Sequence, residues 1–199
     1  MDAEAWDARY RDSELVWSAR PNQFVEAELE DLPPGRALDL GTGEGRNAIW
    51  LAERGWQVTA VDFSQAGLDK GRRLAGDLPV EWVCADATTW SGDGSYDVGV
   101  LAYLQLRGEG RRAAVRNAFA SIRVGGTLLL VAHDTTNLTE GVGGPQDPEV
   151  LMTAEDVLRD LDGDNLDVER AERVAREVAQ ADGSTRTAYD VLVRVVRRG

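Results

Sequence analysis

The segment from Ala37 to Asn47 has the residue types and the spacing of a ligand-binding turn. Two leucines predict a short buried strand, and Gly41, Gly43 and Gly45 predict a tight turn that opens a helix. Glycine lets the backbone approach a ligand without a Cβ clash, and the first turn of a helix offers unpaired N–H donors. The segment therefore predicts a site for a ligand that accepts hydrogen bonds.

Asp62 stands about twenty residues after this turn and ends the next predicted strand. An acid in this position can hold both hydroxyls of a ribose. The turn and the acid together predict a nucleoside site. The structural alternative is that Asp62, like Asp86 after the third strand, only caps a helix.

Three classes of nucleoside ligand compete for this arrangement. A triphosphate loop needs G-x-x-x-x-G-K-[ST], and no lysine stands near the turn. A dinucleotide fingerprint, G-x-G-x-x-G, needs its last glycine at Arg46, whereas Gly45 comes one position early. Asp39 would repel a pyrophosphate but suits a positively charged amino group. S-adenosylmethionine carries an amino group, a sulfonium and a ribose but no phosphate, so the electrostatics favour it.

Composition limits the classes of function. A chain of 199 residues, 43% of them hydrophobic, is most simply one soluble domain. The formal net charge of −13 argues against a nucleic-acid partner, with Arg111, Arg112 and Arg116 expected to form a solvated helix face. The single cysteine, Cys84, excludes an internal disulfide. With no signal peptide and no long apolar run, we expect a cytoplasmic protein that does not contact a membrane.

Predicted strands and helices alternate up to residue 133, which is typical of a parallel sheet covered by helices on both faces. The strands are expected at 36–40, 57–62, 80–85, 96–102 and 127–133, and the helices at 4–10, 22–31, 45–54, 64–75 and 109–122. The tail predicts a loop over 137–148, a helix over 153–161 capped by Thr153, and strands over 166–174 and 188–196. A helix over 168–179 is the alternative for the first of these strands.

With these motifs together, the chain resembles the class I S-adenosylmethionine-dependent methyltransferases, and most closely their small bacterial tellurite-resistance-like and thiopurine-methyltransferase-like members. The resemblance rests on Trp6-Asp7-x-x-Tyr10, Pro21-Asn22, Asp39-x-Gly41-x-Gly43-x-Gly45-Arg46-Asn47, Val61-Asp62, Cys84-Ala85-Asp86 and Gly125-Gly126. It implies an α/β fold, a Rossmann-like doubly wound sheet of seven strands in the order 3-2-1-4-5-7-6, with strand seven antiparallel. It also implies a single methyltransferase domain over 1–199, composed of an N-terminal helical cap (1–34), a cofactor-binding core (35–134) and a lid loop with an antiparallel tail (135–199).

The resemblance further implies which residues contact the cofactor. They are Asp39, Gly41, Thr42, Gly43, Asp62, Phe63, Asp86, Ala87, Leu101, Ala102 and Tyr103. Asp62 would hold the ribose hydroxyls, and Asp86 would accept a hydrogen bond from the adenine amino group. S-adenosyl-L-homocysteine would be the product.

Methyl transfer is an in-line displacement, so orienting the acceptor supplies much of the rate, and a base is needed only when the acceptor arrives protonated. His133 is the only histidine and ends the fifth strand. It is expected either to act as base or acceptor-orienting group or to cap the strand end. Arg176 either faces the acceptor or lies on the surface. No metal site is expected.

Two further segments are expected near the acceptor. The rings of Trp6, Tyr10 and Trp17 either close over the sulfonium by cation–π contact or pack the N-terminal helices on the sheet. Gly143 and Gly144 belong to a glycine-rich segment that forms either a lid or a connector.

The expected acceptor is a small molecule carrying a thiol, chalcogen, hydroxyl or amine. Ala102-Tyr103-Leu104-Gln105 stands where methyltransferases of nucleic-acid bases carry Asn-Pro-Pro-Tyr, which disfavours that substrate. The alternatives are a non-catalytic protein that binds S-adenosylmethionine and an NAD-dependent oxidoreductase. The position of Gly45 and the antiparallel tail disfavour the oxidoreductase. A monomer or a homodimer is expected.

Overall fold

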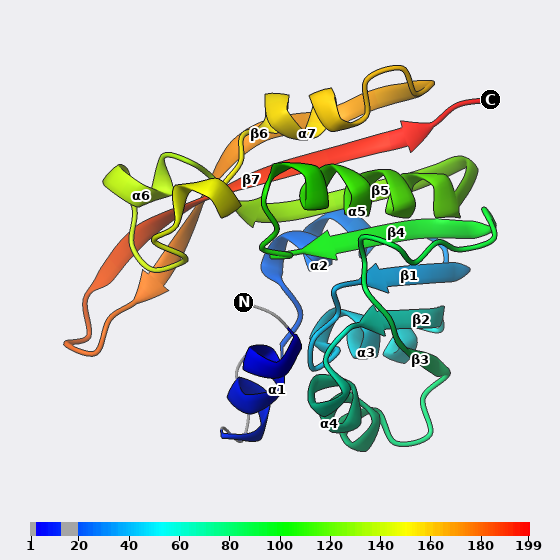
Figure 1. The fold of residues 1–199 in the computed structure, drawn as a ribbon, viewed down its shortest axis with the longest axis horizontal. Helices are drawn as coiled ribbons and strands as arrows, with labels where there is room; N and C mark the ends of the chain where they lie inside the picture. The colour runs from blue at the N-terminus through cyan, green and yellow to red at the C-terminus, as the bar shows by residue number, and fades with distance from the viewer. Residues whose placement is uncertain (1–2, 13–19) are drawn as a thin grey trace.

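The computed structural model describes residues 3–12 and 20–199, so Trp17 lies outside the described residues. A seven-stranded sheet forms the centre of the fold, with the strand order β3-β2-β1-β4-β5-β7-β6 (Figure 1). Its strands are β1 (Arg36–Leu40), β2 (Gln57–Asp62), β3 (Val80–Cys84), β4 (Tyr96–Ala102), β5 (Ile122–His133), β6 (Leu166–Ala179) and β7 (Thr185–Arg197). The first five strands pair in parallel, and β7 runs antiparallel to both β5 and β6. The predicted sheet is confirmed.

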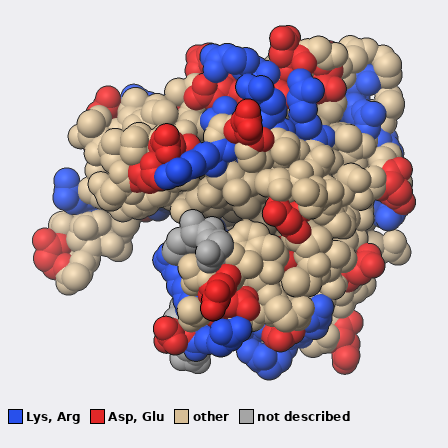
Figure 2. All heavy atoms as spheres, viewed as in Figure 1, with Lys and Arg blue, Asp and Glu red and all other residues tan. Residues whose placement is uncertain are grey.

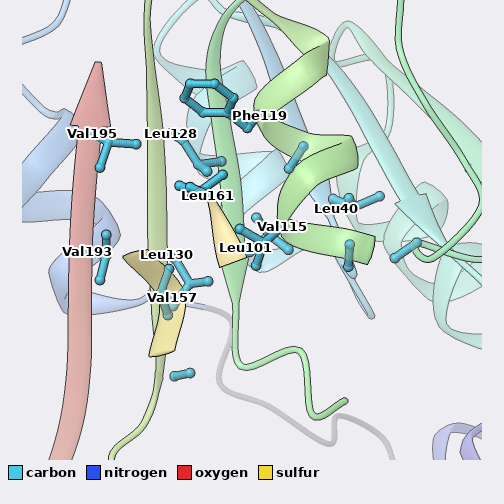
Figure 3. Packing of buried hydrophobic residues seen from close by; sticks show 14 of the residues in the cluster. Leu40, Leu101, Val115, Phe119, Leu128, Leu130, Val157, Leu161, Val193 and Val195 are labelled. Atoms are coloured by element: carbon cyan, nitrogen blue, oxygen red, sulfur yellow. The ribbon is translucent and has the colours of Figure 1, made fainter. Parts of the chain in front are cut away.

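Helices cover both faces of the sheet. They are α1 (Ala3–Arg11), α2 (Gln23–Leu29), α3 (Arg46–Glu53), α4 (Gln65–Ala75), α5 (Gly108–Ser121), α6 (Asn137–Glu140) and α7 (Ala154–Asp160), with a 3₁₀ turn η1 (Pro148–Val150). Successive residues of β5 point to opposite faces, as the pleat of a strand requires. Leu128 and Leu130 pack with α5 and α7 (Figure 3). Leu129 packs with α2 and α3 on the other face.

The helix starts follow capping chemistry that the sequence contains. The side chain of Asn22 accepts hydrogen bonds from the amides of Phe24 and Val25, and Ser64 caps α4. Thr153 and Asp156 form a reciprocal capping box at α7, as expected from the predicted cap. None of the described helices is both long enough and apolar enough to cross a membrane.

The tail strands are longer than predicted. β6 is extended throughout 166–179, so the alternative of a helix over 168–179 is wrong. Its alternating charged residues suit its place at the edge of the sheet, where charges discourage pairing with another chain. β5 begins at Ile122 rather than Thr127, because Ile122 already pairs with Tyr96 of β4; an irregularity that includes Gly125 (φ 79°) follows before regular pairing resumes at Thr127. The segment expected to be a loop over 137–148 contains α6.

The prediction of a solvated arginine face on α5 is correct for Arg112 and Arg116, which are exposed, and wrong for Arg111, whose side chain is 14% exposed. Arg111 and Arg112 both pair with the carboxylate of Asp160, which is fully buried at the end of α7 (2.6 and 3.3 Å). Arg116 donates to the backbone oxygen of Asp160 (2.7 Å). The sequence separates these residues by more than forty positions, so only the packing of α7 on α5 brings the acid to the arginines.

Candidate functional site

The glycine turn connects β1 to α3 and is fastened to β2. Gly41, Gly43 and Gly45 have φ angles of 79°, 59° and 80°, which residues with a Cβ rarely adopt. The amides of Gly41 and Thr42 donate to the backbone of β2 (2.8 and 3.0 Å). The amide of Gly43 donates to the carboxylate of Asp62 (2.8 Å). The turn is therefore held against the end of β2.

Asp39 supports this turn from below. Its Oδ2 atom accepts hydrogen bonds from Oγ1 of Thr42 (2.6 Å) and from the amide of Ala48 in the first turn of α3 (3.1 Å). The side chain is 1% exposed. Burial raises the pKa of Asp39 to about 6, although both hydrogen bonds favour the ionised form. Both hydrogen bonds of Asp39 connect it to the glycine turn and to α3, so this carboxylate stabilises the conformation of the turn.

Asp62 lies at the carboxyl end of β2 and joins the turn to α4. One of its oxygens accepts from the amide of Gly43, and the other accepts from the amide of Ser64 (2.8 Å). Burial raises the pKa of Asp62 above its usual range, and these two backbone hydrogen bonds act in the opposite direction. Each carboxylate oxygen has two lone pairs, so the carboxylate can accept further hydrogen bonds from a ligand.

These residues surround a cavity at the carboxyl ends of the parallel strands, which we call the turn cavity. Ligands of open α/β sheets bind at this edge. The described residues that line it are Trp6, Tyr10, Gly41, Thr42, Gly43, Arg46, Asn47, Asp62, Phe63, Ala102, Tyr103, Leu104, Gln105 and Leu106. The structure therefore brings together most of the residues that the resemblance implied.

Four predicted contacts are not among the described residues that line the turn cavity: Asp39, Asp86, Ala87 and Leu101. Asp86 accepts hydrogen bonds from the amide and hydroxyl of Thr88 (both 2.8 Å) within a turn, and no helix starts there, so the alternative that it caps a helix is wrong. Leu101 points into the core on the α5 side of the sheet (Figure 3). The adenine contact of Asp86 stays a prediction.

Helix α1 closes one side of the turn cavity with two aromatic rings. The rings of Trp6 and Tyr10 stack with their centroids 5.5 Å apart, and both line the cavity. Asp7 ties α1 to the start of α4 by accepting from the hydroxyl of Ser64 (2.5 Å) and the amide of Ala66 (3.2 Å). The hydrogen bond from Ser64 is the main reason that the pKa of Asp7 is lowered.

Tyr103 follows β4 in a left-handed conformation with φ 58°. A non-glycine residue in this region is uncommon, and such strain concentrates at functional sites. Its amide donates to Val131 of β5 (2.7 Å), and its ring lies 4.7 Å from the ring of His133. Burial raises the pKa of Tyr103 above its usual range, so its hydroxyl stays protonated.

A second cavity, which we call the basic cavity, adjoins the first. It is lined by Arg20, Pro21, Asn22, Gln23, Glu26, Arg46, Tyr103, His133 and Arg176. Arg46 and Tyr103 line both cavities. Burial lowers the pKa of the Arg46 guanidinium, which marks a cation held away from water. In a chain of net charge −13, this gathering of cationic side chains is a local exception.

Asp190 of β7 connects the catalytic candidates, and the sequence prediction did not include it. The carboxylate accepts from Nε of Arg176 and from the hydroxyl of Tyr103 (both 2.8 Å), and it lies 3.2 Å from Nδ1 of His133. Arg176 is therefore not a free surface arginine: its side chain is 23% exposed. An isolated acid within the apolar run around Val191 was the signal available in the sequence.

The glycine-rich segment after α6 lies against His133. Gly144 has φ 76°, and a Cβ there would come 3.1 Å from the imidazole ring. The buried side chain of Asn137 donates to the carbonyl of Gly143 (2.9 Å) and accepts from the amide of Tyr189 (2.8 Å). These bonds tie the segment to β7. Whether it acts as a lid stays a prediction.

Comparison with known proteins agrees with this geometry. Residues 37–126 match the family model described as a methyltransferase domain. A demethylmenaquinone methyltransferase from Clavibacter sepedonicus is 35% identical over 50% of this chain and 42% of its own length. Thiocyanate methyltransferase 1 from Brassica oleracea is 25% identical over 79% of this chain and 73% of its own length.

Among solved structures, the N-methyltransferase NodS from Bradyrhizobium japonicum WM9, in complex with S-adenosyl-L-homocysteine, superposes with a TM-score of 0.73. It covers 99% of this chain and 98% of its own, at 18% identity. Residues 37–126 are thus similar to a methyltransferase domain, and the chain has the Rossmann-like fold of a solved methyltransferase, NodS. The ligand bound in NodS, S-adenosyl-L-homocysteine, is the product expected from the cofactor that the sequence predicts.

Proposed function

We propose that the chain is an enzyme that binds S-adenosylmethionine in the turn cavity and methylates a small molecule held in the basic cavity. The observation that carries the proposal is the boundary between the cavities, which Arg46 and Tyr103 share. A methyl donor on one side of this boundary and an acceptor on the other can meet in line. Such positioning supplies much of the rate of a displacement reaction.

The residues of the turn cavity suit this cofactor. Asp62 offers carboxylate lone pairs to ribose hydroxyls, and the glycine turn admits the backbone close to the ligand. Trp6 and Tyr10 offer aromatic faces, which attract a positively charged sulfonium. Bound S-adenosylmethionine would supply an electrophilic methyl group, while the protein orients the acceptor and excludes water.

The acceptor is proposed to be a compact molecule with a thiol, chalcogen, hydroxyl or amine. The names of two relatives specify demethylmenaquinone and thiocyanate, both small molecules, as the acceptors of those proteins. Membership of the tellurite-resistance-like or thiopurine-methyltransferase-like group, a cytoplasmic location and a monomeric or homodimeric state belong to the same proposal. So does the absence of a nucleic-acid partner, which the charge of −13 supports.

Calorimetry with S-adenosylmethionine, S-adenosyl-L-homocysteine and NAD tests the cofactor. We expect binding of the first two and no binding of NAD; the reverse result would overturn the proposal. Product formation over a panel of thiols, chalcogen anions, phenols and amines then tests catalysis. Cofactor binding without turnover of any acceptor would instead support a non-catalytic S-adenosylmethionine-binding protein.

A further inference from the structure

Asp190 is a fully buried acid that contacts three residues of the basic cavity, namely Tyr103, His133 and Arg176. It lies on β7 directly opposite His133 of β5 in the antiparallel register. Residues opposite each other in such a pair carry their side chains on the same face of the sheet. The strand pairing itself therefore holds the carboxylate and the imidazole next to each other.

The two oxygens of Asp190 have different partners. Oδ2 accepts hydrogen bonds from Tyr103 and Arg176, whereas Oδ1 lies 3.2 Å from Nδ1 of His133. Oδ1 and Nδ1 are both buried, and neither makes an aligned hydrogen bond with any group in residues 3–12 or 20–199. Buried polar atoms are almost always hydrogen-bonded, so a small rotation of the imidazole that pairs these two atoms is the favourable arrangement.

The ionisation of Asp190 decides which of the two atoms donates. Burial by itself would raise the pKa of Asp190, but the nearby His133, the hydrogen bonds from Arg176 and Tyr103 and the charge of Arg176 hold it below its usual range. An ionised carboxylate can only accept hydrogen bonds. Nδ1 of His133 must therefore carry the proton when the two atoms pair.

The other ring nitrogen of His133, Nε2, is on the side of the ring that can face the basic cavity. Gly144 covers the Nδ1–Cε1 edge of the ring, where a Cβ would meet both atoms at 3.1 Å. The side chain of His133 is 11% exposed and lines the basic cavity. Because Nδ1 is buried, this exposure falls on the side of the ring that carries Nε2.

We propose that Asp190 is a positioning residue that holds His133 as the Nδ1–H tautomer, so that an unprotonated Nε2 faces the basic cavity and accepts a proton from the methyl acceptor. Arg176 and Tyr103 hold the carboxylate in place for this purpose. The tautomer of His133 follows from the contacts of Asp190. The transfer of a proton from the methyl acceptor to Nε2 rests, in addition, on the proposed function.

The consequence narrows the class of acceptor to one that arrives protonated, namely a hydroxyl, a thiol or a neutral amine. A bond forms between the acceptor atom and the methyl carbon as the sulfur–methyl bond breaks, and the electron pair of the broken bond stays on sulfur. The proton of the acceptor passes to Nε2 and then to solvent. One proton is released for each methyl group transferred, so charge and atoms balance.

The tautomer can be measured directly because His133 is the only histidine in the chain. Protonated and unprotonated imidazole nitrogens have well-separated ¹⁵N chemical shifts, so one pair of ring signals reports the tautomer. The measurement uses the whole chain without cofactor at about pH 8.5, about two units above the ordinary pKa of histidine. We expect Nδ1 to carry the proton; a wild-type spectrum in which Nε2 carries it would overturn the proposal.

Asp190→Asn reverses the pairing with almost no change of shape. The amide oxygen can replace Oδ2 towards Tyr103 and Arg176, which turns the NH₂ group towards Nδ1 and makes Nδ1 an acceptor. We expect the proton to move to Nε2 in this variant. An unchanged tautomer in folded Asp190→Asn would show that Asp190 does not set it.

Asp160→Asn is the matched control. Asp160 is as deeply buried as Asp190 and also pairs with arginine, but it lies at the end of α7 and its partners are on α5. The tautomer of His133 should stay as in the wild type. If Asp190→Asn does not fold, the wild-type spectrum decides alone. Since no cofactor is present, the result is independent of the calorimetry that tests the proposed function.

Discussion

At the scale of single residues, the site depends on carboxylates that each bind several donors. Asp39, Asp62 and Asp190 are all at least nine-tenths buried, and each accepts two or more hydrogen bonds or ion-pair contacts. Burial makes an ionised group costly, and these donors compensate for that cost. The same carboxylates therefore shape the backbone and remain available to a ligand or to His133.

The ribose contact of Asp62 predicts a specific loss of discrimination. Wild-type protein should bind S-adenosyl-L-homocysteine more tightly than its 2′,3′-dideoxy analogue by about 1–3 kcal/mol, the value of hydrogen bonds to a charged acceptor. Asp62→Asn should lose most of this preference in calorimetry, because the substitution removes the negative charge and leaves one acceptor oxygen for two backbone amides and the ribose. Asp86→Asn, at an exposed acid, should keep the preference. Equal preference in all three proteins would contradict the assignment of Asp62.

The buried Asp39 predicts a pH-dependent stability. Its pKa of about 6 in the folded protein lies above the value of 3.8 for an unperturbed aspartate, so the folded state binds more protons between these values. The contribution of Asp39 to the free energy of unfolding therefore falls as pH rises from about 4 to above 6, by about 2–3 kcal/mol. Urea unfolding of Asp39→Asn and wild type across this range should show the variant gaining relative stability with pH. A pH-independent difference would contradict the raised pKa.

At the scale of elements, glycines set how closely helices approach the sheet. The ring of Trp82 on β3 packs on the turn and on α4: a Cβ at Gly45 would lie 2.3 Å from it and a Cβ at Gly71 2.4 Å. An ion pair between Asp160 and Arg111 connects α7 to α5. The sequence pattern predicts each of these elements separately. The contacts of Trp82 hold α4 and the glycine turn against β3, and so they determine the geometry of a turn whose position alone was predicted from the sequence.

A pair of helical glycines separates packing from helix propensity. Gly71→Ala should destabilise the protein by about 1–3 kcal/mol, because the added methyl group overlaps Trp82 and overpacking outweighs the propensity gain. Gly110→Ala in α5 is the control, since its Cβ would have only ordinary contacts from 3.7 Å outwards. It should raise the free energy of unfolding by up to about 1 kcal/mol. Denaturant unfolding measures both, and equal effects would contradict the packing role of Gly71.

At the scale of the whole molecule, the basic cavity is formed by residues from the N-terminal part, the middle and the C-terminal part of the chain. Residues of the segment before α3, among them Asn22, line the basic cavity together with His133 and Arg176 from β5 and β6. Glu28 on α2 pairs with Arg170 of β6 and Arg194 of β7, which ties this helix to the antiparallel tail. Figure 2 shows acidic and basic side chains interspersed over the visible face, so the exposed charge is mixed there.

This connection predicts that Glu28 stabilises the basic cavity. Glu28→Gln should lower the free energy of unfolding by about 1–3 kcal/mol, because its side chain is 9% exposed and two arginines would each lose the more buried of their two acidic partners. Hydrogen exchange of the α2 amides should become faster. Glu172→Gln removes an exposed partner of the same Arg170 and should change stability by less than about 0.5 kcal/mol. Equal effects of the two substitutions would contradict the proposed connection.

The order of the strands was expected from the family resemblance, whereas the sequence by itself determined the alternation of strands and helices, the position of the glycine turn and the cap at Thr153. These features depend on local chemistry, because a positive φ, a cap or an alternating strand is encoded within a few neighbouring residues. Most residues of the turn cavity were predictable for the same reason. They follow directly after strands whose carboxyl ends share one edge of the sheet.

Only the tertiary structure decided how the acceptor side is built. The pairing of β5 with β7 puts Asp190 opposite His133, and the packing of α7 on α5 buries Asp160 among arginines. Strand register and helix docking result from the sum of many long-range contacts, which no local pattern of residue types encodes. The glycine turn could therefore be located from the sequence, whereas the partners of His133 had to be observed in the folded protein.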